Sequence, residues 1–304
     1  MQLALEQLTK SFGEKQVLKG ISLQANSGRA LGLLGRNGAG KTTTIRIVMD
    51  VFPPDGGRVL LDGTPLRDTK VRVGYLPEER GMYPKKKILE QLVYFGCLRG
   101  MKSGDAKRSA LEKLERLGMA EYAGKKLETL SKGNQQKIQL AATLVCNPEI
   151  VILDEPFSGL DPVNAMLLKD VVHELIQAGK IVLFSSHQMN YIEEFCDDIA
   201  ILNGGAIVLS GDLRDIKRSF DRRRILLDSA DAAGICAFVK ERCAALVEQA
   251  SLTEKGQADI RLKKEEDKTQ LLQALAGQSF DVDAFRVYEP SLNDIFVTYT
   301  EGGI

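Results

Sequence analysis

The chain has 304 residues, of which 44% are hydrophobic and 27% charged, an ordinary composition for a globular protein. This length favours about two domains. Lys+Arg and Asp+Glu both number 41, so the chain lacks the basic excess of a nucleic-acid coat, and we expect no nucleic-acid partner. No apolar run approaches the roughly 18 residues of a membrane span, and residues 1–6 do not read as a signal peptide.

The most informative stretch is residues 35–43, which read GRNGAGKTT and fit the phosphate-loop pattern G-x-x-x-x-G-K-[ST]. Residues 30–34 before it predict a buried strand, and residues 43–49 after it predict a helix, the context that this motif requires. Lys41 is expected to reach the β- and γ-phosphates of a nucleotide, and the Thr42 hydroxyl to hold Mg²⁺. The residues expected to bind the nucleotide here are Gly35, Asn37, Gly38, Gly40, Lys41, Thr42 and Thr43.

The segments around this loop alternate between strand and helix patterns. Residues 2–25 predict short antiparallel strands with a turn directly after Phe12. The Phe12 ring is suited either to stacking on an adenine ring or to packing in the core. Two short strands follow at 58–61 and 71–76. From about residue 84 to residue 142 apolar residues recur at helical spacing, which predicts a helical insertion.

A second chemical signal is the segment 149–155, EIVILDE, a buried strand that ends in two carboxylates. A continuous β-branched run of this kind is typical of the middle of a parallel sheet. Beside a phosphate loop, Asp154 is expected to hold Mg²⁺ together with Thr42, and Glu155 to polarise the attacking water. His187 follows the next apolar strand. A lone histidine is normally a surface or core residue, but at the carboxyl end of a strand it is also suited to sensing the γ-phosphate.

The chain changes character near residues 221–224, which read DRRR. We therefore expect a nucleotide-binding domain over residues 1–220 and an accessory domain over 221–304. The accessory segment suggests the order β-α-β-β-α-β, which is that of a ferredoxin-like α+β domain, if a strand lies near Ala250. It contains no cluster of catalytic residue types, so its residues do not indicate a function for this domain.

Five segments, in this order, resemble the motifs of the ATP-binding-cassette (ABC) ATPases. They are the phosphate loop, the loop LPE at 76–78, the signature-like LSKGN at 130–134, the strand ending in Asp154-Glu155, and SGLD at 158–161 followed by His187. The resemblance covers residues 1 to about 215. It implies an α/β P-loop cassette: a mixed central sheet, an antiparallel β subdomain and the helical insertion at about 84–142.

The resemblance also implies roles for individual residues. Phe12 is then the aromatic that stacks on adenine, Glu155 the catalytic base and His187 a switch histidine. Asp161 belongs to the loop that joins two nucleotide sites. Ser131, which is suited to a helix N-cap, and Gly133 are the signature residues that contact phosphate. We expect them to contact ATP bound to a partner chain.

The chain departs from the family pattern at three positions. Lys132 and Asn134 replace the usual residues of the signature LSGGQ, and Glu78 stands where the family usually has glutamine. A glutamate offers an anionic oxygen of similar reach, which is a stronger ligand for Mg²⁺. We therefore expect Glu78 to act both at the metal and in catalysis, as a metal-coupled sensor.

Two further segments, residues 94–101 and 290–296, resemble bacterial ATP-binding subunits of type-2 ABC exporters, a group with sodium-extrusion and drug-export systems. The resemblance implies ATP hydrolysis to ADP and phosphate, with ATP and Mg²⁺ bound. It also implies a separate transmembrane permease subunit, and a homodimer or hetero-pair of ATPase subunits. The chain would then lie in the cytoplasm, on the inner face of the cell membrane.

Two other functions compete with this one. A soluble ABC ATPase that acts on ribosomes or DNA usually carries two cassettes or a long coiled-coil insertion. This chain has one cassette and a short insertion, so the exporter is favoured. A P-loop switch protein outside the ABC family is disfavoured by the LSKGN segment. The transported substrate is not readable, because its pathway belongs to the membrane subunit.

Overall fold

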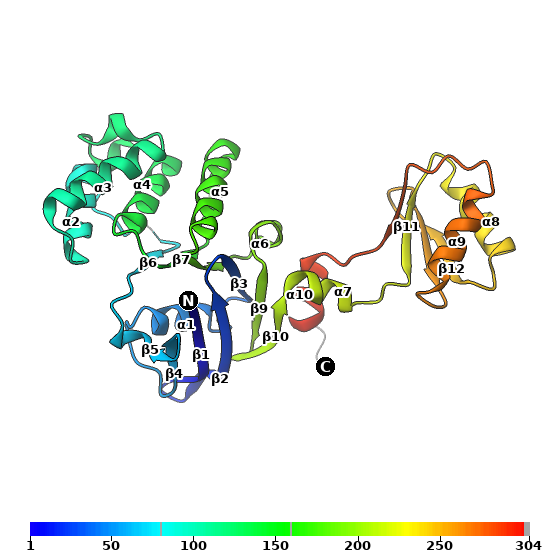
Figure 1. Cartoon of the computed structure of the whole chain (residues 1–304), viewed down its shortest axis with the longest axis horizontal. Helices are drawn as coiled ribbons and strands as arrows, with labels where there is room; N and C mark the ends of the chain where they lie inside the picture. Colours follow the sequence, from blue (N-terminus) through cyan, green and yellow to red (C-terminus); the bar gives the residue numbers. More distant parts are fainter. Residues whose placement is uncertain (80, 159, 301–304) are drawn as a thin grey trace. The chain divides into compact units, whose positions relative to one another are not determined.

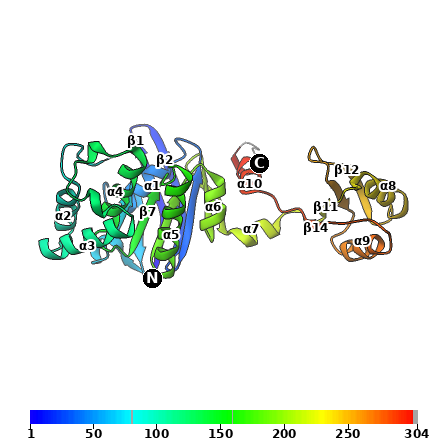
Figure 2. The same cartoon turned by 90° about the horizontal axis from the view of Figure 1, so that it is seen from above.

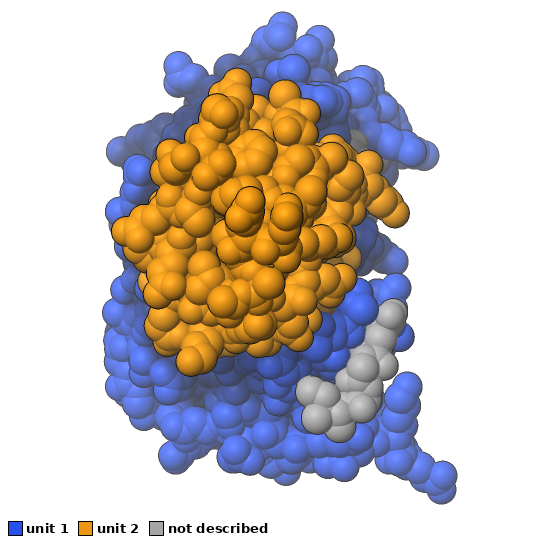
Figure 3. All heavy atoms as spheres, turned by 90° about the vertical axis from the view of Figure 1, so that its right-hand side faces the viewer, with its two compact units in different colours: residues 1–213, 295–304 blue, residues 214–294 orange. Residues whose placement is uncertain are grey.

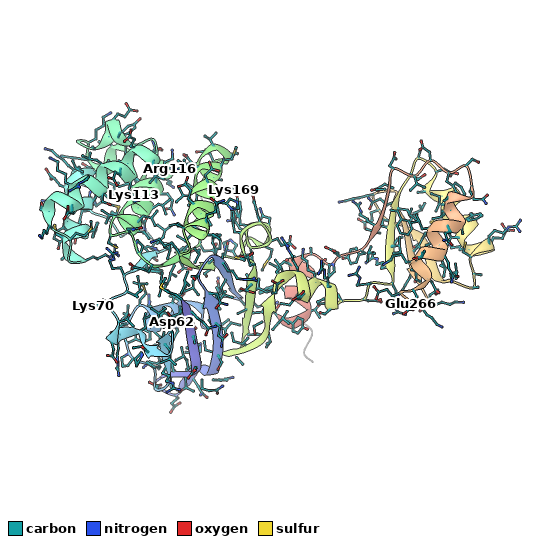
Figure 4. The ribbon with its side chains drawn as sticks, viewed as in Figure 1. Asp62, Lys70, Lys113, Arg116, Lys169 and Glu266 are labelled. Atoms are coloured by element: carbon teal, nitrogen blue, oxygen red, sulfur yellow. The ribbon has the colours of Figure 1, made fainter. Side chains whose placement is uncertain are left out.

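The computed structural model describes residues 1–79, 81–158 and 160–300, and its contacts divide the chain into two compact units (Figure 3). The first unit is Met1–Leu213 together with the chain from Ile295 onward, and the second is Arg214–Asp294. In the part of the chain that is described, no helix is both long enough and apolar enough to cross a membrane.

The first unit is built on a six-stranded sheet with the order β10-β9-β3-β8-β7-β6 (Figure 1). Its strands are β3 (Arg29–Gly35), β6 (Val73–Leu76), β7 (Ile150–Asp154), β8 (Ile181–Ser185), β9 (Asp198–Asn203) and β10 (Ala206–Asp212). β9, β3, β8, β7 and β6 run parallel, whereas β10 at the edge is antiparallel to β9. Every residue of β7 and β8 is buried, as expected for the middle of a parallel sheet.

A four-stranded antiparallel sheet with the order β2-β1-β4-β5 packs its buried leucines into the same core. Its strands are β1 (Gln2–Phe12), β2 (Lys15–Asn26), β4 (Gly56–Leu61) and β5 (Thr64–Pro65). The sequence pattern predicts several short strands in residues 2–25, but β1 and β2 pair as one long hairpin. Register shifts interrupt the alternation of side chains without ending the pairing, and one follows Leu5, near Gln7, whose φ is +50°.

The helices of the first unit fall into two groups. α1 (Lys41–Val48) follows β3, while α5 (Pro162–Gln177) and α6 (Met189–Phe195) connect the later strands of the sheet. The helical subdomain consists of α2 (Ile88–Leu98), α3 (Ser103–Arg116) and α4 (Lys132–Leu144). Figures 1 and 2 both show these three helices side by side. Each buries a stripe of apolar side chains, including Leu92, Leu114 and Ile138, all 0% exposed.

The folded core of the second unit is a four-stranded antiparallel sheet covered by two helices. Its elements are β11 (Arg224–Asp228), α8 (Ala232–Arg242), β12 (Val247–Leu252), β13 (Ala258–Leu262), α9 (Asp267–Ala276) and β14 (Ala284–Val287). This is the β-α-β-β-α-β order, with sheet order β12-β13-β11-β14, and β12 contains Ala250. Its core includes Ile225, Ile260 and Leu271, all 0% exposed.

The division between the units differs from the sequence-based boundary at residue 221. The second unit begins at Arg214, because a short helix, α7 (Leu213–Ser219), precedes β11. The sequence-based bounds 221–304 place the whole C-terminal segment in the accessory domain, but the terminal helix α10 (Leu292–Thr300) belongs to the first unit from Ile295. There the side-chain amide of Asn203 donates a hydrogen bond to the carbonyl of Tyr299 at 3.2 Å. The accessory unit is therefore inserted in the first unit.

Because each unit has its own core, a core substitution in the second unit should destabilise that unit alone. Ile260→Ala removes a side chain that is 0% exposed on β13, which is paired on both sides. We expect a loss of about 2–5 kcal/mol in the free energy of unfolding. Native-state hydrogen exchange should show faster exchange across residues 214–294 and unchanged exchange in residues 1–213.

The control for this prediction is Leu252→Ala on the neighbouring strand β12, where the side chain is 51% exposed. We expect a change within about 0.5 kcal/mol for this variant. Faster exchange in both units of the Ile260→Ala protein would mean that the two units unfold together, contrary to the expectation.

Candidate functional site

The sheet topology brings most of the predicted site residues to one edge. Parallel strands end on the same side of a sheet, so the loops after β3, β8, β7 and β6 meet there. They carry the phosphate loop, Ser186-His187, Asp154-Glu155 and Glu78 respectively.

The phosphate loop is held close to β9 by two glycines. A Cβ at Gly35 would lie 2.5 Å from the carbonyl oxygen of Leu202, so a larger residue does not fit. Gly40, the N-cap of α1, has φ +116°, a conformation that disfavours other residues. Lys41 folds back over the loop, where its Nζ donates to the carbonyl oxygens of Gly35 at 2.5 Å and Arg36 at 3.3 Å. The side chain can therefore move from these carbonyls to a phosphate group.

The remaining residues of the loop are accessible. Asn37, Gly38 and Thr42 are exposed, and Thr43 is half-buried. Thr42 is the second residue of α1, at the positive end of the helix dipole. Backbone N–H groups and a hydroxyl at such a helix end suit a bound phosphate.

The charges at this edge influence one another. Burial lowers the pKa of the Lys41 amino group, whereas the negative charges of Glu155, Asp154 and Glu78 act to raise it. All three predicted carboxylates therefore lie near enough to Lys41 to stabilise its charged form.

Asp154 is a buried carboxylate with few partners. It is 7% exposed, and the Tyr75 hydroxyl donates to its Oδ2 at 3.2 Å. Burial raises the pKa of Asp154, an effect opposed by Tyr75 and by the nearby Ser185 hydroxyl. Ser185 Oγ is itself buried and meets no partner at hydrogen-bond geometry among the described residues. The site thus combines a carboxylate with an unsatisfied hydroxyl, an all-oxygen donor set of the kind that hydrated Mg²⁺ prefers.

Glu155 is held in a strained and well-defined position. It has φ +48°, although it is not glycine, and it is 6% exposed. The Ser186 hydroxyl donates to Oε2 at 2.9 Å, and the His187 backbone N–H donates to Oε1 at 2.7 Å. His187 Nδ1 lies 2.7 Å from the same Oε1, with the ring largely exposed. Such strain, on the order of 1–3 kcal/mol, persists where surrounding contacts fix the conformation, and it is typical of active sites.

Glu78 lies in a loop that α4 holds in place. Its side chain is exposed, but the neighbouring carbonyls of Pro77 and Glu79 accept hydrogen bonds from Gln139 Nε2 at 3.3 and 3.1 Å. Gln139 is a buried residue of α4, the helix whose N-cap is Ser131. A shift of α4 would therefore move both the Glu78 loop and the Ser131 end.

A second group of predicted residues gathers at the starts of α4 and α5. Ser131 caps α4 and remains exposed. A Cβ at Gly133 would lie 2.8 Å from Asn164 Nδ2, and the Asp161 carboxylate caps α5 by accepting from the Asn164 N–H at 3.0 Å. The structure thus brings Ser131, Gly133 and Asp161 together. Gly159, from the same SGLD motif, lies outside the described residues.

The ring of Phe12 lies at the end of β1 and is 49% exposed. Half of its surface is therefore available to a ligand, which favours the stacking alternative over a place in the core.

Sequence reasoning missed four polar side chains that hold the site together: Tyr75, Gln139, Asn164 and Ser186. The clearest available signal was Gln139, a polar residue on the apolar face of a helical pattern, where it must find partners. Ser186 also directly precedes the candidate His187. Tyr75 and Asn164 carry no local pattern that distinguishes them.

Two protein families match the chain. Residues 18–158 match the family described as "ABC transporter", and residues 211–300 match "ATP-binding protein DrrA1-3-like, C-terminal domain". Among solved structures, the "ATP binding subunit of ABC transporter" aligns with TM-score 0.66 and 28% identity, over 72% of this chain and 93% of that one. The dimeric cassette MJ0796 aligns with TM-score 0.63 and 25% identity, over 70% and 99%.

Curated relatives extend the similarity through both units. The ABC transporter ATP-binding protein YhaQ of Bacillus subtilis is 40% identical over 299 residues, 97% of each chain. The linearmycin resistance ATP-binding protein LnrL of the same organism is 32% identical over 304 residues, 98% of each. A structure of MJ0796 is described as a post-hydrolysis state with ADP and Pi. The chain therefore belongs to the ABC transporter ATP-binding proteins, and it is an ATPase.

Proposed function

We propose that the chain is the ATPase subunit of an exporter, and that ATP binding pairs it with a second ATPase subunit on a separate membrane subunit. The proposal for how ATP is hydrolysed rests on one observation. The Glu155 carboxylate is held in a fixed position at the carboxyl ends of the parallel strands, the same edge of the sheet at which Lys41 lies. The transport part rests on the family and on the names of relatives.

The phosphate loop supplies the binding site for ATP. Backbone N–H groups of the loop and the start of α1 face the phosphates, and Lys41 exchanges its two carbonyl partners for the β- and γ-phosphates. Asp154, through its carboxylate, and Thr42, through its hydroxyl, would hold Mg²⁺ beside the unsatisfied Ser185 Oγ. When bound, the ion supplies positive charge that offsets the developing negative charge on the phosphates.

Glu155 is the residue that orients the attacking water. Its two oxygens are fixed by Ser186 and His187, so its remaining lone pairs can accept hydrogen bonds from a water molecule in a set direction. The exposed ring of His187 is available to the γ-phosphate. Glu78, whose charge acts on Lys41 from the loop after β6, completes the carboxylates around the phosphates.

A second chain would complete the site. Ser131, Gly133 and Asp161 lie at the exposed starts of α4 and α5, whereas the phosphate loop lies at the strand edge. We place these residues against ATP bound to a partner, with either an identical or a different ATPase subunit as that partner. The dimeric structure of the related cassette MJ0796 supports this arrangement.

Export as the transport direction is supported by relatives. LnrL is named for linearmycin resistance, and a relative from Paraburkholderia xenovorans, 33% identical over 213 residues, is named Nod factor export ATP-binding protein I. By this proposal the chain docks from the cytoplasm on a membrane-spanning permease at the inner face of the cell membrane. The identity of the exported compound follows from that permease.

Replacing the catalytic carboxylate should separate hydrolysis from binding. Glu155→Gln keeps the shape of the side chain but removes the charge that orients water, so we expect turnover to fall about 10²–10⁴-fold with ATP affinity retained. Phosphate release and equilibrium binding of ATP measure the two effects. The control is Glu149→Gln just before β7, whose carboxylate pairs with Arg72 at 3.0 Å. Turnover of Glu155→Gln within a few-fold of the unmodified protein would disprove the assignment.

Trapped ATP should make the dimer visible. With saturating Mg-ATP, we expect Glu155→Gln to elute as a twofold-symmetric dimer, measured by size exclusion with light scattering. Adding Ser131→Arg should return it to a monomer, because the new side chain blocks the surface that meets the partner's ATP. Ser103→Arg, at the exposed start of α3, is the matched control and should leave the dimer intact. A monomer under all conditions argues against self-pairing and leaves pairing with a different subunit.

Glu78 should tolerate glutamine but not alanine. Glu78→Gln keeps an oxygen within reach of Mg²⁺, so most of the ATPase activity should remain. Glu78→Ala should lose coupling of transport to hydrolysis far more than ATP affinity. ATPase rate and transport at several Mg²⁺ concentrations measure both, with Glu79→Ala as the exposed neighbouring control. A Glu78→Ala protein that behaves like the unmodified one in both assays would remove the sensor role.

A further inference from the structure

We propose that Phe52, supported by a clamp between Lys10 and Asp55, is a positioning residue that fixes the Phe12 ring for stacking on the nucleotide base. The inference rests on the proposed function, in which Phe12 stacks on adenine. It identifies the residues that hold the Phe12 ring, and it predicts that Phe52 affects binding of the base but not of the phosphates.

The contact between the two rings is direct. The Phe12 and Phe52 ring centroids lie 5.6 Å apart with an interplanar angle of 88°, an edge-to-face arrangement. Phe52 is half-buried and packs against the hydrophobic core, whereas Phe12 is 49% exposed. Phe52 is therefore the fixed partner, and it restrains the orientation of an otherwise mobile surface ring.

A charged clamp holds the two segments together. Lys10 Nζ donates to the Pro53 carbonyl and to Asp55 Oδ1, both at 2.8 Å, and its side chain is 13% exposed. The Ser11 backbone N–H donates to Asp55 Oδ2 at 2.6 Å. Asp55 thus accepts from two successive residues of β1 directly before Phe12. These bonds hold the end of β1, which carries Phe12, at a fixed distance from the loop after α1, which carries Phe52.

The Lys10 charge also lies over both aromatic rings, 5.8 Å from the Phe12 centroid and 5.4 Å from the Phe52 centroid. Both distances are within the range of a cation–π interaction. The ammonium group therefore favours the ring arrangement in addition to the hydrogen bonds that it makes.

Phe52 lies only a short helix away from the phosphate loop along the chain. Phe52 and Asp55 follow α1, the helix that begins at Lys41 in the phosphate loop. The same continuous segment thus reaches from the phosphates to the ring that meets the base. Fixing the Phe12 ring before binding reduces the entropy that stacking would otherwise cost.

Stacking has a recognisable signature among ligands. Every base has a π-face, so stacking tolerates different bases. Loss of the Phe52 contact should weaken ATP and GTP equally. It should not affect inorganic tripolyphosphate, which has no base. An aromatic pair contributes enough that we expect about three- to tenfold weaker binding of both nucleotides.

The chain contains no tryptophan, so Phe12→Trp places a single indole, which can be excited selectively over the seven tyrosines, at the stacking position. In this background we expect ATP and GTP, but not tripolyphosphate, to change the indole emission. Adding Phe52→Leu should lower the fluorescence anisotropy of the free protein, because the indole loses its restraint. Calorimetric titration of Phe52→Leu with Phe12 unchanged should give the three- to tenfold loss for both nucleotides, with tripolyphosphate affinity unaltered.

Three further variants test the explanation. Phe52→Tyr keeps an aromatic edge and should restore nucleotide affinity. Asp55→Asn weakens the clamp and should lower nucleotide affinity in the same base-dependent way. The matched control is Phe280→Leu in the second unit, where Phe238 and Phe280 form a similar pair at 5.5 Å and 66°. It should leave all three affinities unchanged.

The outcomes separate the inference from the proposed function. If the indole at position 12 does not respond to ATP, stacking by Phe12 fails and the inference fails with it. If the indole responds but Phe52→Leu changes neither anisotropy nor nucleotide affinity, only the positioning role is overturned. An equal loss for ATP and tripolyphosphate would also overturn it, because the substitution would then have disturbed the phosphate loop.

Discussion

The site depends on the parallel pairing of β3, β8, β7 and β6. Parallel register aligns Leu33 with Ser185 and, through β8, with Asp154, so residues distant in sequence end at one level of the sheet. The phosphate loop, the carboxylates and the histidine need no long-range side-chain contacts to meet, because the backbone ladder brings them together. The buried run 150–154 is accordingly both a fully buried part of the sheet and the segment that ends in the carboxylate pair.

The polar side chains at this edge of the sheet form only some of the hydrogen bonds that they could make with one another. Each carboxylate oxygen of Glu155 accepts a hydrogen bond, one from Ser186 and one from His187, which fixes the direction of the side chain. Asp154 and Ser185, which are register partners on the neighbouring strands β7 and β8, retain unused acceptor and donor capacity in a buried place. Unsatisfied buried groups are costly in a folded protein, and they persist where a ligand supplies the missing partner. The edge is thus fixed at Glu155, the carboxylate proposed to orient water, and unsatisfied at Asp154 and Ser185, where a cation is proposed to bind.

The sequence predicted the parts of the fold that follow from local pattern. The phosphate loop, the strand at 150–154 and the cap at Ser131 each carry a short-range physical signal, and each lies where expected. Contacts between segments distant in the sequence could not be predicted from local pattern. The alternation of apolar and polar residues in 2–25 predicts several short strands, because it breaks at the bulges of β1, although the pairing with β2 continues through them. The apolar stripe of α10 gives no information about which unit will cover it. The edge contact of Phe12 with Phe52 likewise depends on tertiary packing.

The return of α10 to the first unit has a thermodynamic consequence. Both ends of the second unit, at Leu213 and Ile295, are anchored in one folded body, so the roughly 80 residues between them form a closed loop even when unfolded. Loop closure removes conformational entropy from that unfolded segment, as a crosslink would, and so favours its folded state. By linkage, the folded insertion holds the ends of its segment near one another and lowers the entropy lost when α10 docks. Chain connectivity alone thereby couples the folding of the second unit to the docking of α10.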